Sequence, residues 1–117
     1  MNKPWVAHYA PGVEPEIDAA KYNSVVEIFD TYTDMYAGNK AYISMHTSVT
    51  YQELRAKSED FAAYLQHQMG LKKGDKFAIM LPNILQYPIA LFGALKAGLT
   101  VVNVNPLYTP RELKHQL

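Results

Sequence analysis

The sequence lacks cysteine altogether and has no excess of charge of either sign. Without cysteine the chain can form neither disulfides nor thiolate metal sites, and it has no cysteine nucleophile. Eleven Lys and Arg balance eleven Asp and Glu, so the formal net charge is zero. Nucleic-acid-binding domains usually carry a basic excess or a basic stripe, and we therefore expect no nucleic-acid partner. The lysines within residues 72–76 are interrupted by Asp75, which is typical of a solvated turn.

Long hydrophobic runs are also missing. The most apolar segment extends from residue 84 to residue 104, but Gln86, Pro88 and Lys96 interrupt it, and a membrane span needs about 20 predominantly apolar residues. No uninterrupted apolar stretch follows Met1, so the sequence predicts no secretory signal. With 49% hydrophobic and 19% charged residues, the composition is typical of one small globular domain.

Familiar catalytic signatures are absent as well. Gly93 and Gly98 have the spacing of a phosphate loop, but Leu99-Thr100 follow them, which favours a helix and its C-cap. There is no G-x-S-x-G nucleophile elbow. We expect the histidines, which lack metal-ligand spacing, to be surface or partly buried residues, and one acidic cluster to be a solvated face: His8, His46, His67 and His115, and Glu14, Glu16 and Asp18.

What is present divides the chain at residue 24. Residues 1–23 are rich in proline and aromatic side chains, which predicts an extended leader lying on the body and not a flexible linker. Ser24 and Glu27 form a capping-box pattern, and apolar residues at helical spacing predict a helix that ends at Gly38. Two short strands, 41–45 and 48–50, are expected to form a small hairpin around His46-Thr47.

A second amphipathic helix is predicted to begin after Thr50. Glu53, three residues later, completes another capping box, and Gly70 is expected to end the helix. Its buried stripe is expected to contain Leu54, Phe61, Ala62, Leu65 and Met69.

The clearest unit is a strand–helix–strand pattern over residues 76–104. Continuous apolar strands, 76–81 and 99–104, flank a helix over 84–97, which predicts a parallel βαβ crossover with both sheet faces covered. We expect Asn83 to cap this helix, Pro88 to bend it and Gly98 to end it. The helix is apolar nearly all round, which indicates that further protein covers it: Leu85, Ile89, Leu91, Phe92 and Leu95.

A last helix has a clear start and no visible end. Thr109, Pro110 and Glu112 provide an N-cap, a proline in the first turn and an acidic third residue, but no terminating glycine follows. We therefore expect a truncated chain. The predicted fold class is α/β: an incomplete layered sheet with a parallel βαβ unit (76–104), two preceding amphipathic helices and a small hairpin.

Several runs of residues are distinctive beyond their local structure. They are MLPN (80–83), QYP (86–88), ALFG (90–93), AG (97–98) and VVNVNPLYTPREL (101–113). These runs closely resemble the adenylate-forming superfamily and, within it, the bacterial long-chain fatty acid–CoA ligases. Thr50-Tyr51 with Leu54, FAAYL (61–65), GLKKGD (70–75) and the aromatic leader fit as well, so the resemblance covers the whole chain. It implies that residues 24–117 are the first part of the large N-terminal domain of such an enzyme.

The resemblance also implies an activity. In this family a fatty acid carboxylate attacks the α-phosphate of ATP, and the thiol of coenzyme A then attacks the acyl-adenylate and releases AMP. It implies ATP, Mg²⁺ and coenzyme A as cofactors, a long-chain fatty acid as substrate, and a cytoplasmic enzyme loosely attached to the inner face of the membrane.

The family's phosphate loop, nucleotide pocket and catalytic lysine lie after the matched stretch, so no catalytic, cofactor-binding or metal-binding residue is carried over. We expect this chain to be scaffold, to be inactive alone and to bind no cofactor. Asn83 and Asn105 follow the two strands, where α/β folds often place ligands, but we expect them to cap or turn the chain.

Two other interpretations compete with this one. The chain could be a self-standing interaction module that forms homo-oligomers through its incomplete sheet and apolar helix. A small nucleotide-binding or receiver-type domain is the third interpretation. It needs glycines or an acidic residue just past a strand end, and Pro82-Asn83 and Asn105-Pro106 provide neither.

Overall fold

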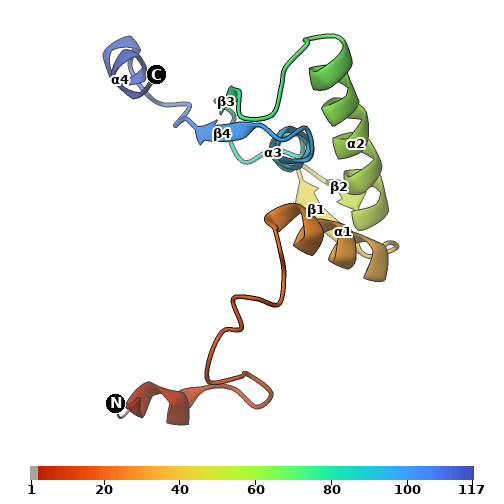
Figure 1. Cartoon of the computed structure of the whole chain (residues 1–117), viewed down its shortest axis with the longest axis vertical. Coiled ribbons are helices and arrows are strands. Elements are labelled where there is room, and N and C mark those ends of the chain that lie inside the picture. Colours follow the sequence, from red (N-terminus) through yellow and green to blue (C-terminus); the bar gives the residue numbers. More distant parts are fainter. Residues whose placement is uncertain (1–2) are drawn as a thin grey trace.

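A computed structural model of the chain describes residues 3–117. Its elements, in chain order, are η1 (Pro4–His8), α1 (Val25–Met35), β1 (Lys40–Ser44), β2 (Thr47–Thr50), α2 (Tyr51–His67), β3 (Lys76–Ile79), α3 (Gln86–Lys96), β4 (Thr100–Asn103) and α4 (Pro110–Gln116). Figure 1 shows a body built from α1, α2, α3 and two small sheets, with the leader at one end and α4 projecting at the other.

The parallel βαβ unit is confirmed. Strands β3 and β4 pair in parallel from Lys76↔Thr100 to Ile79↔Asn103, and α3 connects them. Gly98 ends the crossover helix as predicted: with φ at +81° its N–H reaches the carbonyl of Leu95. One face of the pair packs against α3 and α2, whereas Ala78 and the following Met80 stay exposed. The prediction that both sheet faces are covered was therefore wrong for residues 3–117.

The predicted hairpin is also confirmed, with its turn shifted by one residue. Ser44 pairs with Thr47, so the two loop residues are Met45 and His46, and not His46-Thr47. Both have positive φ, 48° and 66°, which is the signature of a type I′ turn. Such a turn matches the twist of the flanking strands, which explains why two residues without glycine adopt it.

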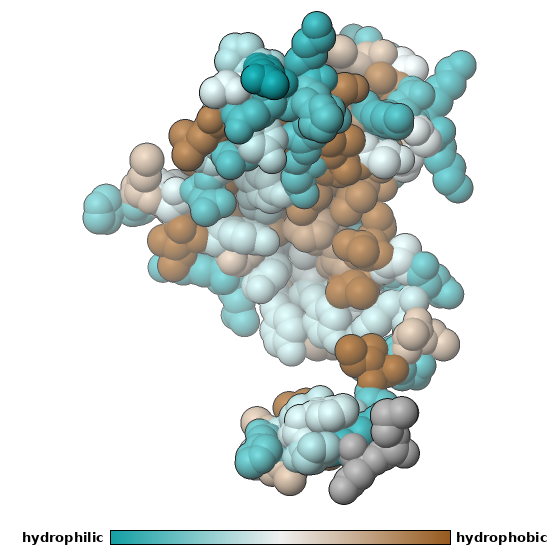
Figure 2. Space-filling model, turned by 90° about the vertical axis from the view of Figure 1, so that its left-hand side faces the viewer, coloured by the Kyte–Doolittle hydropathy of each residue, from teal (hydrophilic) through white to brown (hydrophobic). Residues whose placement is uncertain are grey.

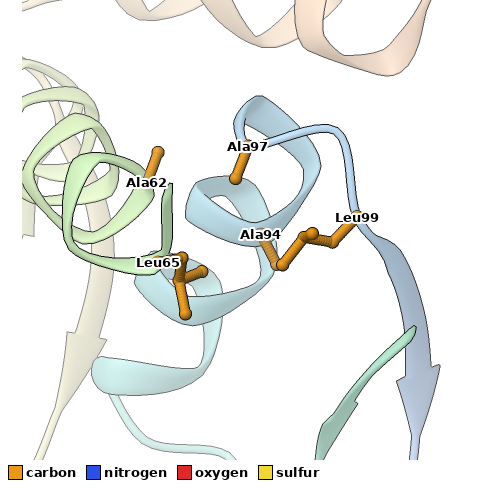
Figure 3. Packing of buried hydrophobic residues seen from close by; sticks show 5 residues of the cluster. All are labelled: Ala62, Leu65, Ala94, Ala97 and Leu99. Carbon is orange, nitrogen blue, oxygen red and sulfur yellow. The ribbon is translucent and has the colours of Figure 1, made fainter. Parts of the chain in front are cut away.

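Two apolar clusters hold the body together. Figure 3 shows the first, where side chains of α2 meet α3 and the connection from α3 to β4: Ala62, Leu65, Ala94, Ala97 and Leu99. The second joins α1, the hairpin and α2 through Phe29, Val49 and Leu54, and Phe29 stacks on Phe92 of α3 at 4.1 Å between ring centroids. Met69, predicted to lie in the buried stripe of α2, is 56% exposed because α2 ends before it.

The caps of α2 and α4 are confirmed as full capping boxes. Thr50 and Glu53 exchange side-chain and backbone hydrogen bonds, as do Thr109 and Glu112. At α1, Ser24 accepts the Glu27 N–H as predicted, but the Glu27 carboxylate accepts from the N–H of Asn23 instead.

Three predictions about α1 and α3 were wrong. Helix α1 ends at Met35, where the Tyr36 N–H bonds to the Tyr32 carbonyl, and Gly38 is not left-handed and ends nothing. Asn83 does not cap α3, because the chain turns once more before the helix begins at Gln86. Pro88 therefore falls in the first turn, where backbone N–H groups have no helical partner, so it removes no bond and requires no bend.

The leader does not lie on the body as we expected. Residues 3–21 are exposed or at most half-buried, and Figure 1 shows the leader extending away from α1. Local contacts shape it, such as the Val6 N–H to the Lys3 carbonyl and the ion pair between Lys3 and Glu16. At its end it contacts α1, where the hydroxyls of Tyr22 and Tyr32 lie 2.6 Å apart.

Candidate functional site

The carboxyl ends of β3 and β4 form the edge where open α/β sheets usually bind ligands. Ile79 and Asn103 are partners in register there, and the N–H of Val104 donates to the Ile79 carbonyl at 2.9 Å. The pairing thus continues one residue past β4 and buries Val104. This edge is the first place to look for a site.

Asn103 is the centre of a hydrogen-bonded cluster at this edge. The Tyr87 hydroxyl donates to Asn103 Oδ1 at 2.8 Å, and Gln116 Nε2 donates to the Asn103 carbonyl at 2.8 Å. These bonds join the first turn of α3, the end of β4 and the last residue of α4. Sequence reasoning missed this cluster because its members are 13 and 16 residues apart and follow no periodicity. The cluster contains no charged side chain, so it can orient groups but offers no ionic catalyst.

The two asparagines singled out in the sequence, Asn83 and Asn105, have different roles. Asn105 Oδ1 accepts the N–H of Leu107 at 2.9 Å and so turns the chain toward α4, which confirms its expected turning role. Asn83 is exposed and lines a small pocket of about 210 Å³ between β1 and the start of α3, together with Tyr42 and Tyr87.

A larger apolar pocket of about 330 Å³ opens between the helices and the hairpin. Its lining is almost entirely aliphatic and aromatic and comes from α1, β1, α2 and α3: Val25, Ile28, Phe29, Tyr32, Thr33, Ala41, Tyr42, Tyr51, Leu54 and Phe92. The buried Thr33 hydroxyl is satisfied by the Phe29 carbonyl at 2.7 Å. The pocket therefore presents an apolar surface and no reactive group.

Charged side chains link α1, α2 and α3, and sequence reasoning missed them as a group. Lys96 Nζ, on a side chain only 12% exposed, lies 2.5 Å from Asp30 Oδ1 and 3.2 Å from Glu59 Oε1. Arg55 Nε lies 3.1 Å from the same Glu59 oxygen and 3.9 Å from Asp30. The i, i+4 spacing of Arg55 and Glu59 was readable from sequence, but Lys96 joins them from 37 residues away.

The network shifts the pKa values of Glu59 and Arg55. Hydrogen bonds from Arg55 and Lys96 hold the pKa of Glu59 below its ordinary value, against an opposing effect of partial burial. The Glu59 carboxylate in turn raises the pKa of Arg55. The arrangement favours the ionised forms of Glu59 and Arg55. It acts as a clamp because its pairs between helices connect Asp30 of α1 with Arg55 of α2 and with Lys96 of α3, and Lys96 with Glu59 of α2.

The remaining candidates from the sequence do not assemble into a site. All four histidines are exposed. Among residues 3–117, no three side chains of the His, Asp and Glu types gather as a metal site would require. Within the same residues, no helix has both the length and the apolarity needed to span a membrane.

Residues 29–117, most of the chain, match the model of the AMP-binding enzyme family. The chain belongs to the AMP-binding enzymes. The match begins inside α1 and contains both sheets, α2, α3 and α4.

Relatives of this AMP-binding chain include the long-chain-fatty-acid–CoA ligase of Yersinia pestis. It is 54% identical over 117 residues, which cover 100% of this chain and 21% of the relative. The ligase of the same name from Bacillus subtilis is 37% identical over 99% of this chain and 20% of its own length. The chain thus spans about a fifth of the length of the curated relatives it matches.

Solved structures confirm the predicted fold class. The N-terminal subdomain of Klebsiella oxytoca NpsA, in complex with 3-hydroxybenzoyl-AMSN, superposes with a TM-score of 0.75 at 29% identity, over 79% of this chain and 23% of that one. Most of this AMP-binding chain therefore has the architecture of such a subdomain.

Proposed function

We propose that this chain is a scaffold portion of a long-chain fatty acid–CoA ligase. The observation that carries the proposal is the 54% identity to a ligase of that name over the whole chain. Residues 24–117 would be the first part of the large N-terminal domain, with 1–23 as its leader. The neutral cluster around Asn103 supports a scaffold role, since its amides and phenol can only orient neighbouring groups.

The reaction assigned to the whole enzyme has two steps. A long-chain fatty acid carboxylate attacks the α-phosphate of ATP and releases pyrophosphate, and the thiol of coenzyme A then displaces AMP from the acyl-adenylate. Mg²⁺ would offset the phosphate charge in the first step. The described residues do not fit these groups: the turn after β3 offers Pro82, which has no N–H, and no carboxylate or histidine cluster faces the strand ends. We therefore assign no step to a residue of this chain.

The proposal is tested by comparing this chain alone with a chimera. In the chimera, this chain replaces the segment of the Yersinia pestis ligase that aligns with it over 117 residues. We expect no fatty-acid-dependent ATP–pyrophosphate exchange from the chain alone and clear exchange from the chimera. Robust exchange by the purified chain contradicts the scaffold role, and a folded chimera without exchange contradicts the ligase assignment. The intact Yersinia pestis enzyme is the control.

The same proposal places the whole enzyme in the cytoplasm, loosely attached to the inner face of the membrane.

A second candidate function is a self-associating module, which the exposed Ala78 and Met80 on the uncovered face of β3–β4 favour. Light scattering distinguishes the two: a stable homo-oligomer of the pure chain supports the module, and a strict monomer counts against it.

A further inference from the structure

The apolar pocket between α1, β1, α2 and α3 has the size of a small-molecule site. Its volume of about 330 Å³ lies within the range of about 300–1,000 Å³ that is usual for ligand pockets. Two of its lining residues, Leu54 and Thr33, are only 1% and 3% exposed. The pocket is therefore shaped by side chains that belong to the packed body.

The lining of this pocket suits an alkyl chain. Of the residues that the structure describes, none with a charged side chain lines it. The Thr33 hydroxyl already donates to the Phe29 carbonyl, and the rings of Phe29 and Phe92 stack on each other. A polar group would lose its hydration in the pocket without gaining a partner, whereas an alkyl chain would only leave water.

One edge of the pocket, in contrast, is polar. Tyr32 lines the pocket, and its hydroxyl lies 2.6 Å from the hydroxyl of Tyr22, which belongs to the leader. Lys21 Nζ lies 5.3 Å from the centre of the Tyr22 ring. Figure 1 and Figure 2 show the leader leaving the body, through a narrow neck in Figure 2. The polar edge thus lies where the leader joins the body.

The groups at this edge can bind a carboxylate. The two hydroxyls share one hydrogen bond, so the pair keeps one O–H proton that can be donated to a ligand. The hydrogen bond with Tyr22 raises the pKa of Tyr32, against an opposing effect of the Lys21 ammonium, so the Tyr32 hydroxyl stays protonated at neutral pH. An O–H donor beside an ammonium favours an anion, because hydrogen bonds to ionised groups are the stronger ones.

We propose that this pocket binds a free fatty acid, with the alkyl chain among the helices and the hairpin and the carboxylate at Lys21 and the Tyr22–Tyr32 pair. The binding is non-covalent and needs neither ATP nor coenzyme A. The choice of a fatty acid among alkyl carboxylates rests on the proposed function. The match of an apolar pocket to a chain, and of its polar edge to a carboxylate, rests on the residues of this chain.

Isothermal titration of the 117-residue chain, below the micelle concentration of each ligand, tests the site. Decanoate should bind saturably with one site per chain, and acetate should not bind detectably. From hexanoate to decanoate, affinity should rise roughly fourfold for each added methylene, because each one is buried. The uncharged 1-decanol should bind about two- to tenfold more weakly than decanoate, because it lacks the anion that the polar edge recognises.

Matched variants assign the two ends of the ligand. Ala41→Leu fills the pocket from β1 and should weaken decanoate binding about tenfold or more, whereas Ala56→Leu makes the same change at an exposed position of α2 and should not. Lys21→Gln should weaken decanoate binding about two- to fivefold and leave decanol binding unchanged. Lys72→Gln removes an equal charge from an exposed turn and should change neither.

Three results would overturn the proposal. They are the absence of saturable decanoate binding, decanol that binds as tightly as decanoate, and a folded Ala41→Leu chain that binds as well as Ala56→Leu. If Ala41→Leu does not fold, the ligand series on the unchanged chain decides alone. Because these titrations contain no ATP, their failure is distinct from a failure of the ligase assignment, which pyrophosphate exchange by the chimera tests.

Discussion

Gly93 of α3 lies directly against α2, with no room for a side chain. A Cβ added at Gly93 would lie 2.8 Å from Phe61 Cδ1 and 2.9 Å from the Ser58 carbonyl oxygen. The carbonyl belongs to the helix backbone and cannot move aside alone. We predict that Gly93→Ala destabilises the chain by about 1–3 kcal/mol, despite the better helix propensity of alanine. Urea unfolding followed by circular dichroism measures the change.

Gly38 provides the matched control for this substitution. It is exposed, it is not left-handed, and a Cβ there would have no neighbour within 4 Å. Gly38→Ala should therefore leave stability unchanged or raise it slightly by restricting the unfolded chain. A loss in Gly38→Ala equal to that in Gly93→Ala would show that contact with α2 is not the cause.

At the scale of elements, the sequence predicted what local chemistry determines. The capping boxes at Thr50 and Thr109 follow a four-residue pattern, and both helices begin where the pattern says. The end of α1 and the start of α3 were missed, because Gly38 and Asn83 have the right residue types but α1 already ends at Met35 and α3 begins only at Gln86. Helix boundaries depend on tertiary contacts that a single sequence does not display.

The hairpin turn is the element whose sequence fits its conformation least. Met45 and His46 both have positive φ, which costs side chains with a Cβ about 1 kcal/mol or more each, and type I′ turns favour Asn-Gly. We predict that the double change Met45→Asn and His46→Gly stabilises the chain by about 0.5–1 kcal/mol in thermal unfolding. Met45→Ala retains a Cβ at the same position and should give no such gain. A double variant that is no more stable than the parent contradicts the assigned turn.

At the scale of the whole molecule, residues distant in sequence decide how the parts fit. The βαβ unit and the family were readable from residues 76–113, whereas the clamp of Asp30, Arg55, Glu59 and Lys96 was not, because it forms only after three helices have packed. The Asn103 cluster was missed for the same reason. Sequence reasoning thus recovered the elements and their order, and the polar contacts between elements came from the structure.

The clamp predicts how stability depends on pH. The pKa of Glu59 is lowered in the folded chain, so its contribution to stability is present above its ordinary value of 4.5 and is lost as pH falls through the folded pKa. Glu59→Gln should therefore be less stable than the parent at about pH 7, and the difference should shrink as pH falls toward about 3. Asp60→Asn, which removes an exposed carboxylate one residue along α2, is the control and should leave the pH profile unchanged. Urea midpoints across this range measure both variants. A difference between Glu59→Gln and the parent that stays constant with pH would mean that the ionised carboxylate does not hold the three helices together.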